Sequence, residues 1–254
     1  MNNAKVKEIN WAGLMVENFD SAVKFFTNIL GMQLGNLYKD RQVAQFRLAS
    51  GKLFEVFGPK NRERKEKYRY FDGVALGFEV SNLEKAHKKL STEGIKLITD
   101  VESSSNNSWV MFLGPEKRVL QVQQSTKLGL KNISFVSLYA SNLPETVKFY
   151  RDILQLDPAN PDEDPEKSNW YSFKTGDSIL AIERGGVRKN GMKTRIENPF
   201  LLQFKVESKE LLEAMNKRLE DNGVKLYDRA KKTSYGLITN FCDPDGNKVE
   251  IIFQ

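Results

Sequence analysis

Hydrophobic and polar positions alternate along residues 7–16 and again along residues 131–140, which predicts a strand with two different faces in each place. Apolar residues at helical spacing follow each strand. The first predicted helix can be capped by Asn18 or Asp20, and the second has Pro144 near its first turn. The apolar stripe of the first helix consists of Ala22, Phe25, Phe26, Ile29 and Leu30.

Three short strands are expected after each helix. The segments that suit them are Asn36–Tyr38, Val43–Ala49 and Lys52–Phe57 in the first half, and Trp170–Lys174 and Ser178–Glu183 in the second. The stretch Pro158–Lys167 carries three prolines and is typical of an irregular connection.

The same order of elements then starts again within each half. Downstream of the first set we expect a strand at 74–80, a helix at 83–93, and strands near 95–99, 108–113 and 118–123. The second set continues with a strand at 199–206, a helix at 208–222, and strands near 224–228, 235–241 and 247–253. The chain is therefore predicted to be an α+β protein that contains the unit βαβββ four times.

The two halves also match each other in sequence. A shift of 124 positions lays Val23-Lys24-Phe25-Phe26 on Val147-Lys148-Phe149-Tyr150. The shift grows to 129 where Gly94-Ile95-Lys96-Leu97 meets Gly223-Val224-Lys225-Leu226, as small loop insertions would produce. We expect two modules, residues 1–126 and residues 127–254.

Two stretches of the repeat carry a family likeness: Val16-Glu17-Asn18-Phe19-Asp20-Ser21-Ala22-Val23-Lys24-Phe25-Phe26 and Asp243-Pro244-Asp245-Gly246-Asn247. With the paired βαβββ units, the chain resembles the vicinal oxygen chelate (VOC) superfamily over residues 7–254. That superfamily includes glyoxalase I, bleomycin-resistance proteins and extradiol dioxygenases. The resemblance implies curved, partly closed mixed sheets whose concave face forms a cup that holds the ligand.

The resemblance also implies four metal-ligand positions in each half, on inward-facing strand residues. In the first half they fall on Trp11, Glu55, Ala75 and Gln121. In the second half they fall on Phe135, Leu180 or Ala181, Leu201 and Glu250. Only two carboxylates survive in these eight positions, so we expect no metal and no other cofactor.

Histidine content supports the same expectation. An iron site of two histidines and one carboxylate needs two imidazoles, and the sequence has one histidine, His87. The buried stripe of its helix is better carried by Leu83, Ala86 and Leu90, so we expect His87 to have no functional role.

Two arrangements of the units are open at this stage. The halves can exchange units, which places first-half strands beside second-half strands. One cup would then hold both Glu55 and Glu250, and the other would be apolar. Two glutamates in a partly dry cavity favour the protonated form of each other, which suits a general acid or base. Without exchange, the two carboxylates sit in separate cups.

Strand alternation indicates which side chains face the cups. The candidate catalytic residues are Glu55 and Glu250. The candidate ligand-binding residues are Trp11, Glu55, Gln121, Phe135, Tyr139, Leu201, Gln203 and Glu250. Further wall candidates are Arg47, Trp109 and Trp170. Aromatic walls with a few amides and charges suit a mid-sized organic ligand, although large side chains such as Trp11 and Phe135 can instead fill the cups.

Composition narrows the class of protein. With 40% hydrophobic and 11% aromatic residues the chain can bury a core, which excludes a disordered protein. The single cysteine, Cys242, and an N-terminus without an apolar run favour the cytosol. No window approaches the roughly 20 apolar residues that cross a bilayer, so we expect no membrane partner. The net charge is +6, but two glutamates interrupt the densest basic stretch, Arg62–Arg69, so we expect no nucleic-acid partner.

Three functional hypotheses remain. The preferred one is a metal-free protein that binds a small organic ligand, because six of the eight metal positions have lost their ligands. The second is a lyase, isomerase or hydrolase that uses Glu55 or Glu250 as acid or base, or in a divergent metal site. The third is a structural or regulatory protein that binds acidic partners through residues 59–69 and the Arg188–Arg195 loop. The sequence leaves open whether the chain is an enzyme, and whether it is a monomer or a homodimer.

Overall fold

The computed structural model of the chain describes residues 5–60, 74–104, 107–124, 132–185 and 200–254. Several expectations lie wholly or mostly outside these residues: the basic stretch Arg62–Arg69, the segment 59–69 proposed for acidic partners, the Arg188–Arg195 loop, and the module boundary between residues 126 and 127.

The described residues form the βαβββ unit four times, as predicted. The first unit consists of β1 (Glu8–Met15), α1 (Phe19–Lys24), the π-helical turn η1 (Phe25–Ile29), β2 (Leu34–Tyr38), β3 (Val43–Arg47) and β4 (Leu53–Phe57). The second consists of β5 (Val74–Val80), α2 (Leu83–Thr92), β6 (Glu102–Ser103), β7 (Ser108–Leu113), the 3-10 turn η3 (Pro115–Lys117) and β8 (Val119–Gln124). The third consists of β9 (Ile133–Ala140), α3 (Leu143–Lys148), the π-helical turn η4 (Phe149–Ile153), β10 (Asp157–Pro158), β11 (Trp170–Thr175) and β12 (Ser178–Arg184). The fourth consists of β13 (Phe200–Lys205), α4 (Lys209–Asp221), β14 (Asp228–Thr233), β15 (Gly236–Cys242) and β16 (Lys248–Phe253).

Helices α1 and α3 begin in the same way, at an asparagine that follows the first strand of the unit. The Oδ1 atom of Asn18 accepts a hydrogen bond from the backbone N–H of Ser21 at 3.1 Å, and that of Asn142 accepts one from Glu145 at 3.3 Å. Of the two residues that the sequence offers as a cap for α1, Asn18 is therefore the one used.

Two predicted strands are wrong. The sequence predicts a strand at residues 95–99, but only Leu97 forms an isolated bridge, to Phe112 in β7. The strand that pairs with β7 at this edge is β6. The sequence also predicts a strand at residues 224–228, but the strand of this unit, β14, begins only at Asp228. Val224 instead closes the end of α4, where its N–H donates to the Leu219 carbonyl. Apolar alternation misplaces these strands because β6 and β14 are edge strands with mostly polar side chains. The two-residue strand β10, also at an edge, is too short to predict.

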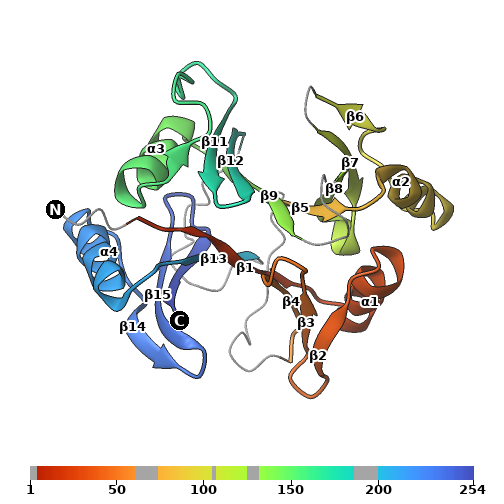
Figure 1. Cartoon of the computed structure of the whole chain (residues 1–254), viewed down its shortest axis with the longest axis horizontal. Helices are drawn as coiled ribbons and strands as arrows, with labels where there is room; N and C mark the ends of the chain where they lie inside the picture. Colours follow the sequence, from red (N-terminus) through yellow and green to blue (C-terminus); the bar gives the residue numbers. More distant parts are fainter. Residues whose placement is uncertain (1–4, 61–73, 105–106, 125–131, 186–199) are drawn as a thin grey trace. The chain divides into compact units, whose positions relative to one another are not determined.

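Hydrogen bonds join the strands into two eight-stranded mixed sheets. The first sheet has the order β14-β15-β16-β13-β1-β4-β3-β2, and the second has the order β10-β11-β12-β9-β5-β8-β7-β6. The pairs β5/β8 and β13/β16 are parallel, whereas the consecutive strands of each unit form antiparallel hairpins. Both sheets are open, and each combines strands from the two sequence halves, which is the arrangement with exchanged units. Each helix contacts strands of its own unit (Figure 1).

The chain also divides into two larger compact units, each of which contains more than one βαβββ unit: residues 13–136, and residues 1–12 with 137–254. These two are the units meant below when a residue is placed in one unit or the other. Each unit has an aromatic core. In the unit of residues 13–136, Phe26, Phe46, Phe54 and Phe78 are fully buried, and the ring centroids of five of their six pairs lie 4.8–6.4 Å apart. In the other unit, fully buried Tyr150 and Phe173 pack with centroids 6.2 Å apart.

The hairpin between β15 and β16 is built around a buried carboxylate, Asp243. Its Oδ1 accepts hydrogen bonds from the backbone N–H groups of Asp245 and Asn247, at 3.0 and 2.7 Å. Its Oδ2 accepts from the Asn247 Nδ2 at 2.8 Å and from the Tyr150 hydroxyl at 3.0 Å. Burial, the largest cause, raises the pKa of Asp243 to about 7, although the bonds from Asn247 and Tyr150 lower it. The hairpin is thus anchored to the core of its unit through one carboxyl group.

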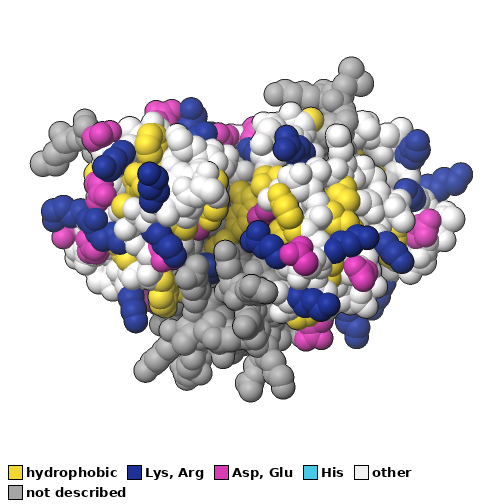
Figure 2. Space-filling view, turned by 90° about the horizontal axis from the view of Figure 1, so that it is seen from below, with side chains coloured by type: hydrophobic (Ala, Val, Ile, Leu, Met, Phe, Trp, Pro, Cys, Tyr) yellow, Lys and Arg dark blue, Asp and Glu magenta, His cyan; other side chains and the backbone are white. Residues whose placement is uncertain are grey.

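Charges of both signs are interspersed on the molecular face in Figure 2, where Lys and Arg side chains lie among Asp and Glu rather than in one patch. Within the described part of the chain, no helix has the length and apolar character that a membrane crossing requires.

Candidate functional site

Glu250 in β16 lies beside Gln203 in β13. Their Cα atoms are partners in the parallel pairing of these strands, and both side chains are only 5% exposed. Gln203 donates from Nε2 to Glu250 Oε1 at 2.6 Å, while Gln203 Oε1 accepts from the Nδ2 of Asn10 in β1 at 2.8 Å. Because Asn10 occupies the amide oxygen, the amide nitrogen of Gln203 is directed at the carboxylate. The structure thus brings together two of the predicted site residues and adds Asn10, which the sequence did not suggest.

The polar row continues on the other side of Glu250. Asn240 in β15 is its Cα partner, is fully buried, and donates from Nδ2 to Asp228 Oδ2 at 3.1 Å. Asn240 Oδ1 is buried and has no hydrogen-bond partner among the described residues. An acceptor without a partner beside a buried carboxylate is a position where a bound ligand can donate. The register of the β15–β16 hairpin could have pointed to Asn240, because it places this residue opposite Glu250.

Glu55 in β4 has an equivalent environment in the unit of residues 13–136. The Gln45 Nε2 donates to Glu55 Oε1 at 2.5 Å, and Gln45 Oε1 accepts from the Nδ2 of Asn36 at 2.7 Å. Gln45 is the Cα partner of Glu55 in the β3–β4 hairpin. Glu55 is 9% exposed, so this carboxylate is also largely removed from water.

Glu55 and Glu250 therefore each end a hydrogen-bond chain of the same kind, in which an asparagine amide orients a glutamine amide toward a carboxylate oxygen. A hydrogen bond donated to a carboxylate stabilises its ionised form. The two hydrogen-bond chains are built from different strands. Asn36 and Gln45 come from β2 and β3, just before Glu55 in sequence, whereas Asn10 and Gln203 come from β1 and β13. This difference in origin shows that the arrangement is not a simple copy carried by the repeat.

The remaining candidates of the first sheet are apolar and buried. Trp11 and Leu201 are 7% and 3% exposed, and Leu201 is the Cα partner of Lys248, which is itself buried. Their side chains offer no oxygen or nitrogen lone pair to a metal ion.

In the second sheet, Gln121 and Phe135 lie near each other at Gly77. Gln121 is the Cα partner of Gly77, and a Cβ at Gly77 would lie 2.7 Å from the Phe135 Cβ. Gly77 therefore leaves the space that the Phe135 side chain occupies. Ala75, the remaining family position in this unit, is buried two residues earlier in β5.

Tyr139 belongs to a polar cluster that the sequence did not suggest. The Ser137 hydroxyl donates to Glu183 Oε1, and the Tyr139 hydroxyl also hydrogen-bonds Glu183. Burial, followed by the charge of Glu183, raises the pKa of Tyr139, so this hydroxyl keeps its proton. The second sheet, which we expected to be apolar with exchanged units, therefore carries a carboxylate.

The register of β11 and β12 distinguishes Leu180 from Ala181, the two candidates for the fourth-strand position that the resemblance implies. Leu180 is fully buried opposite Phe173, whose ring belongs to the core. Strand alternation then places Ala181 on the face that carries Glu183. The position has a methyl side chain, which cannot bind a metal.

The donor set does not fit the metal that the resemblance implies. Four family positions in each sheet would have to supply nitrogen or carboxylate ligands. They carry Trp11, Glu55, Leu201 and Glu250 in the first sheet and Ala75, Gln121, Phe135 and Ala181 in the second. In the described parts of the chain, no three His, Cys, Asp or Glu residues cluster as metal ligands would.

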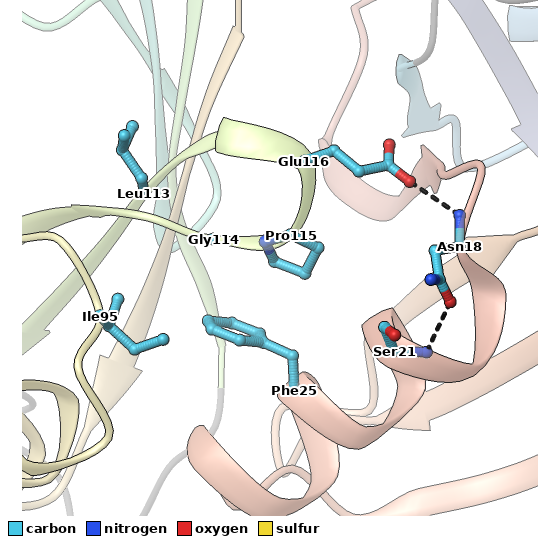
Figure 3. Close-up of a pocket in the computed structure, with 8 residues that line it drawn as sticks. All are labelled: Asn18, Ser21, Phe25, Ile95, Leu113, Gly114, Pro115 and Glu116. Atoms are coloured by element: carbon cyan, nitrogen blue, oxygen red, sulfur yellow. Dashed lines mark hydrogen bonds between the residues drawn. The ribbon is translucent and has the colours of Figure 1, made fainter.

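A cleft of about 420 Å³ lies away from these residues, in the unit of residues 13–136 (Figure 3). Its apolar wall is formed by Phe25, Ile95, Leu113 and Pro115, and Glu116 reaches across from the β7–β8 connection to the start of α1. The remaining residues that line it are Asn18, Ser21 and Gly114.

Glu116 holds the start of α1 in place. Its Oε1 accepts hydrogen bonds from the backbone N–H groups of Glu17 and Asn18, at 2.5 and 2.9 Å. Asp245 has the same role in the other unit, where its Oδ1 accepts from the backbone N–H and the hydroxyl of Ser141. We expect Glu116→Ala to lower the free energy of unfolding by about 1 kcal/mol, as loss of an intramolecular hydrogen bond typically does.

Urea denaturation of the two variants Glu116→Ala and Glu116→Gln tests this prediction. Glutamine keeps the accepting Oε1, so it should retain most of the stability that alanine loses. Equal losses in the two variants would show that the hydrogen bonds accepted by Glu116 do not stabilise the fold.

The repeated βαβββ units, the mixed open sheets and the polar rows on their strands define a tandem protein of the glyoxalase-like class. A model of the Glyoxalase/Bleomycin resistance protein/Dioxygenase superfamily matches residues 8–117 and 132–251, and the chain belongs to this superfamily. No curated protein matches the chain in sequence.

Solved structures show the same fold. A "putative dioxygenase" from Bacillus subtilis subsp. subtilis str. 168 is similar with a TM-score of 0.74 and 10% identity, over 98% of this chain and 85% of that one. Glyoxalase I from Zea mays is similar with a TM-score of 0.72 and 16% identity, over 96% of this chain and 92% of that one. At these identities the likeness concerns the fold and does not carry over a reaction.

Proposed function

We propose that this protein binds a small organic ligand at buried carboxylates that are oriented by glutamine amides, Glu250 in the unit of residues 1–12 with 137–254 and Glu55 in the unit of residues 13–136, without the metal that the resemblance implies. The observation that supports the proposal most directly is the pair of Asn–Gln–Glu chains. Each hydrogen-bond chain holds a buried carboxylate in a fixed orientation, although Trp11 and Leu201, the other two family positions in the first sheet, are apolar.

The chemistry of these groups suggests the class of ligand. A carboxylate accepts hydrogen bonds and donates none, and the unpartnered Asn240 Oδ1 beside Glu250 is likewise an acceptor. The apolar residues Leu201 and Trp11 suit a hydrocarbon or aromatic body. The proposed ligand is therefore an apolar or aromatic molecule that carries hydroxyl or amine donors.

The alternative, a lyase, isomerase or hydrolase with Glu55 or Glu250 as acid or base, uses the same two carboxylates. The two functions differ in what a glutamine substitution does. Glutamine preserves the shape of the side chain but cannot transfer a proton, so it would abolish turnover while leaving most of the binding in place. A ligand-binding protein would instead lose affinity.

Two measurements test the proposal. Elemental analysis of the purified protein should find far less than one metal ion per chain, and stoichiometric metal would overturn the metal-free reading. Tryptophan fluorescence should respond saturably to aromatic phenols and arylamines and much less to the same ring systems without donors.

Glutamine variants then assign the site. We expect Glu250→Gln to weaken the binding of the best phenol or arylamine about tenfold or more, since a hydrogen bond to a charged group contributes roughly 1.5–3 kcal/mol. Glu166→Gln is the matched control, because Glu166 is an exposed carboxylate in the same unit. Equal affinity of both variants would contradict a role for Glu250.

A further inference from the structure

Glu183, in the middle of three strands of the second sheet, has aromatic residues on both sides. The strand order β11-β12-β9 places β12, which carries Glu183, between the two strands that carry Trp170 and Tyr139. Trp170 is the Cα partner of Glu183 in the antiparallel β11–β12 pair, so their side chains emerge on the same face. Ser137 and Tyr139 approach Glu183 from β9 through their hydroxyl groups.

Trp170 differs from the other aromatic residues of its strand. Tyr171 and Phe173 are buried in the core, whereas Trp170 is 52% exposed. Exposure of an indole ring is unfavourable in water, since a tryptophan side chain is largely apolar. The exposed ring lies directly opposite the Glu183 carboxylate. An accessible aromatic ring and a nearby negative charge are two features of a site for an organic cation.

The charge of Glu183 is oriented but not neutralised by the described residues. Its two hydrogen-bond donors, Ser137 and Tyr139, are neutral hydroxyls, and among the described residues it makes no ion pair. The neighbouring Arg184 does not serve as its partner, because the Arg184 guanidinium donates to the backbone carbonyls of Pro165, Glu166 and Ser168. A carboxylate has about four lone-pair positions, so positions remain for a ligand.

We propose that Glu183, Tyr139 and Trp170 form a binding site for an organic cation with a methylated ammonium group. Such a cation is weakly hydrated and interacts with the faces of aromatic rings, while the carboxylate neutralises its charge. A metal ion would instead need several oxygen or nitrogen ligands. The proposal does not depend on the proposed function, since it concerns other residues, in another sheet.

The experiment compares choline with its neutral analogue 3,3-dimethylbutan-1-ol, which has the same shape without the charge. Binding to the full chain is followed at constant ionic strength through the indole N–H signals of the three tryptophans in ¹H–¹⁵N spectra, and the Trp170 signal is identified with Trp170→Phe. We expect choline to shift the Trp170 signal saturably, and the neutral analogue to bind at least about fivefold more weakly.

Two variants with the same change of charge test the carboxylate. Glu183→Gln should weaken choline binding about tenfold or more, whereas Glu166→Gln, an exposed carboxylate of the same unit, should leave it nearly unchanged. Thermal unfolding of each variant shows that it is folded. Because Trp170 is exposed, Trp170→Leu should fold normally and also weaken binding, which keeps the test decisive if Glu183→Gln is unstable.

Three outcomes would overturn the proposal: no saturable choline binding, equal binding of choline and the neutral alcohol, or equal effects of Glu183→Gln and Glu166→Gln. The result is separable from the proposed function. Glu250→Gln should not alter choline binding, and Glu183→Gln should not alter the binding of the phenol or arylamine.

Discussion

Asp243→Asn should remove most of the pH dependence of unfolding that this side chain gives the protein. Burial raises the pKa of Asp243 from its usual 3.8 to about 7, so between these values the folded state holds a proton that the unfolded state has lost. The stabilising contribution is therefore complete below a pH of about 4 and is lost as the pH rises through about 7. At 1.36 kcal/mol for each pKa unit, the full loss amounts to roughly 4 kcal/mol.

Asparagine is a suitable probe because it keeps the turn. Its Oδ1 can still accept from the backbone N–H groups of Asp245 and Asn247. Its Nδ2 can donate to the Tyr150 oxygen and, once the Asn247 amide turns its Oδ1 toward it, to Asn247. Urea denaturation at pH 5 and pH 8 measures the free energy of unfolding of both proteins. From pH 5 to pH 8 this free energy should fall by roughly 2–3 kcal/mol more in the unmodified protein than in Asp243→Asn. Parallel pH profiles would show that Asp243 titrates as an ordinary aspartate.

Tyr150→Phe provides an independent check on the same carboxyl group. The Tyr150 hydroxyl lowers the pKa of Asp243, so its removal should raise that pKa further and extend the pH dependence of unfolding to higher pH. The loss of one buried hydrogen bond should also lower stability by about 1 kcal/mol. The phenyl ring itself should fit, because the corresponding residue of the first half is Phe26, which is fully buried.

The fold was predictable because the repeat presents each unit more than once. A single apolar run such as Val147–Tyr150 does not distinguish a helix from a strand, but its match with Val23–Phe26 and the flanking asparagines do. The edge strands were less predictable. The residues of β14 are almost all polar, and its register shifts between Asp228 and Lys231, so no alternating pattern marks it.

The partners of the two glutamates were not predictable from alternation alone. Asn36 reaches Gln45 across a β2–β3 register that shifts between Leu34 and Asn36, and an irregularity of this kind inverts the expected facing of a strand. Asn10 donates to Gln203 although the two residues are 193 positions apart in sequence. Such a contact follows from the strand order of the sheet, which the sequence left open.

Glu183 shows how a one-residue choice hides a site. Assignment of the fourth-strand family position to Leu180 turns Glu183 toward the core, whereas assignment to Ala181 turns it to the opposite face. The β11–β12 register decides for Ala181, because Leu180 lies opposite Phe173. The hydrogen bond from Ser137 agrees with this assignment, because Ser137 lies two residues from both Phe135 and Tyr139 and so shares their face of β9.

Gln203→Glu should be destabilising at pH 8 and much less so at pH 5. The Gln203 Nε2 lies 2.6 Å from Glu250 Oε1, so the substitution brings a second carboxylate into contact with a buried one. Two carboxylates this close cannot both ionise without strong repulsion, and one of them then binds a proton with a raised pKa. We expect a loss of roughly 3–5 kcal/mol in the free energy of unfolding at pH 8, as for an uncompensated buried charge.

Acidification restores the missing hydrogen bond, because a protonated carboxyl can donate to its neighbour as the amide did. Urea denaturation at the two pH values measures the recovery. Gln45→Glu is the matched variant in the other unit, where the amide lies 2.5 Å from Glu55 Oε1, and it should respond in the same direction. A pH-independent loss in both variants would mean that the glutamines act through packing alone, and the oriented carboxylates on which the proposed ligand site depends would then lack support.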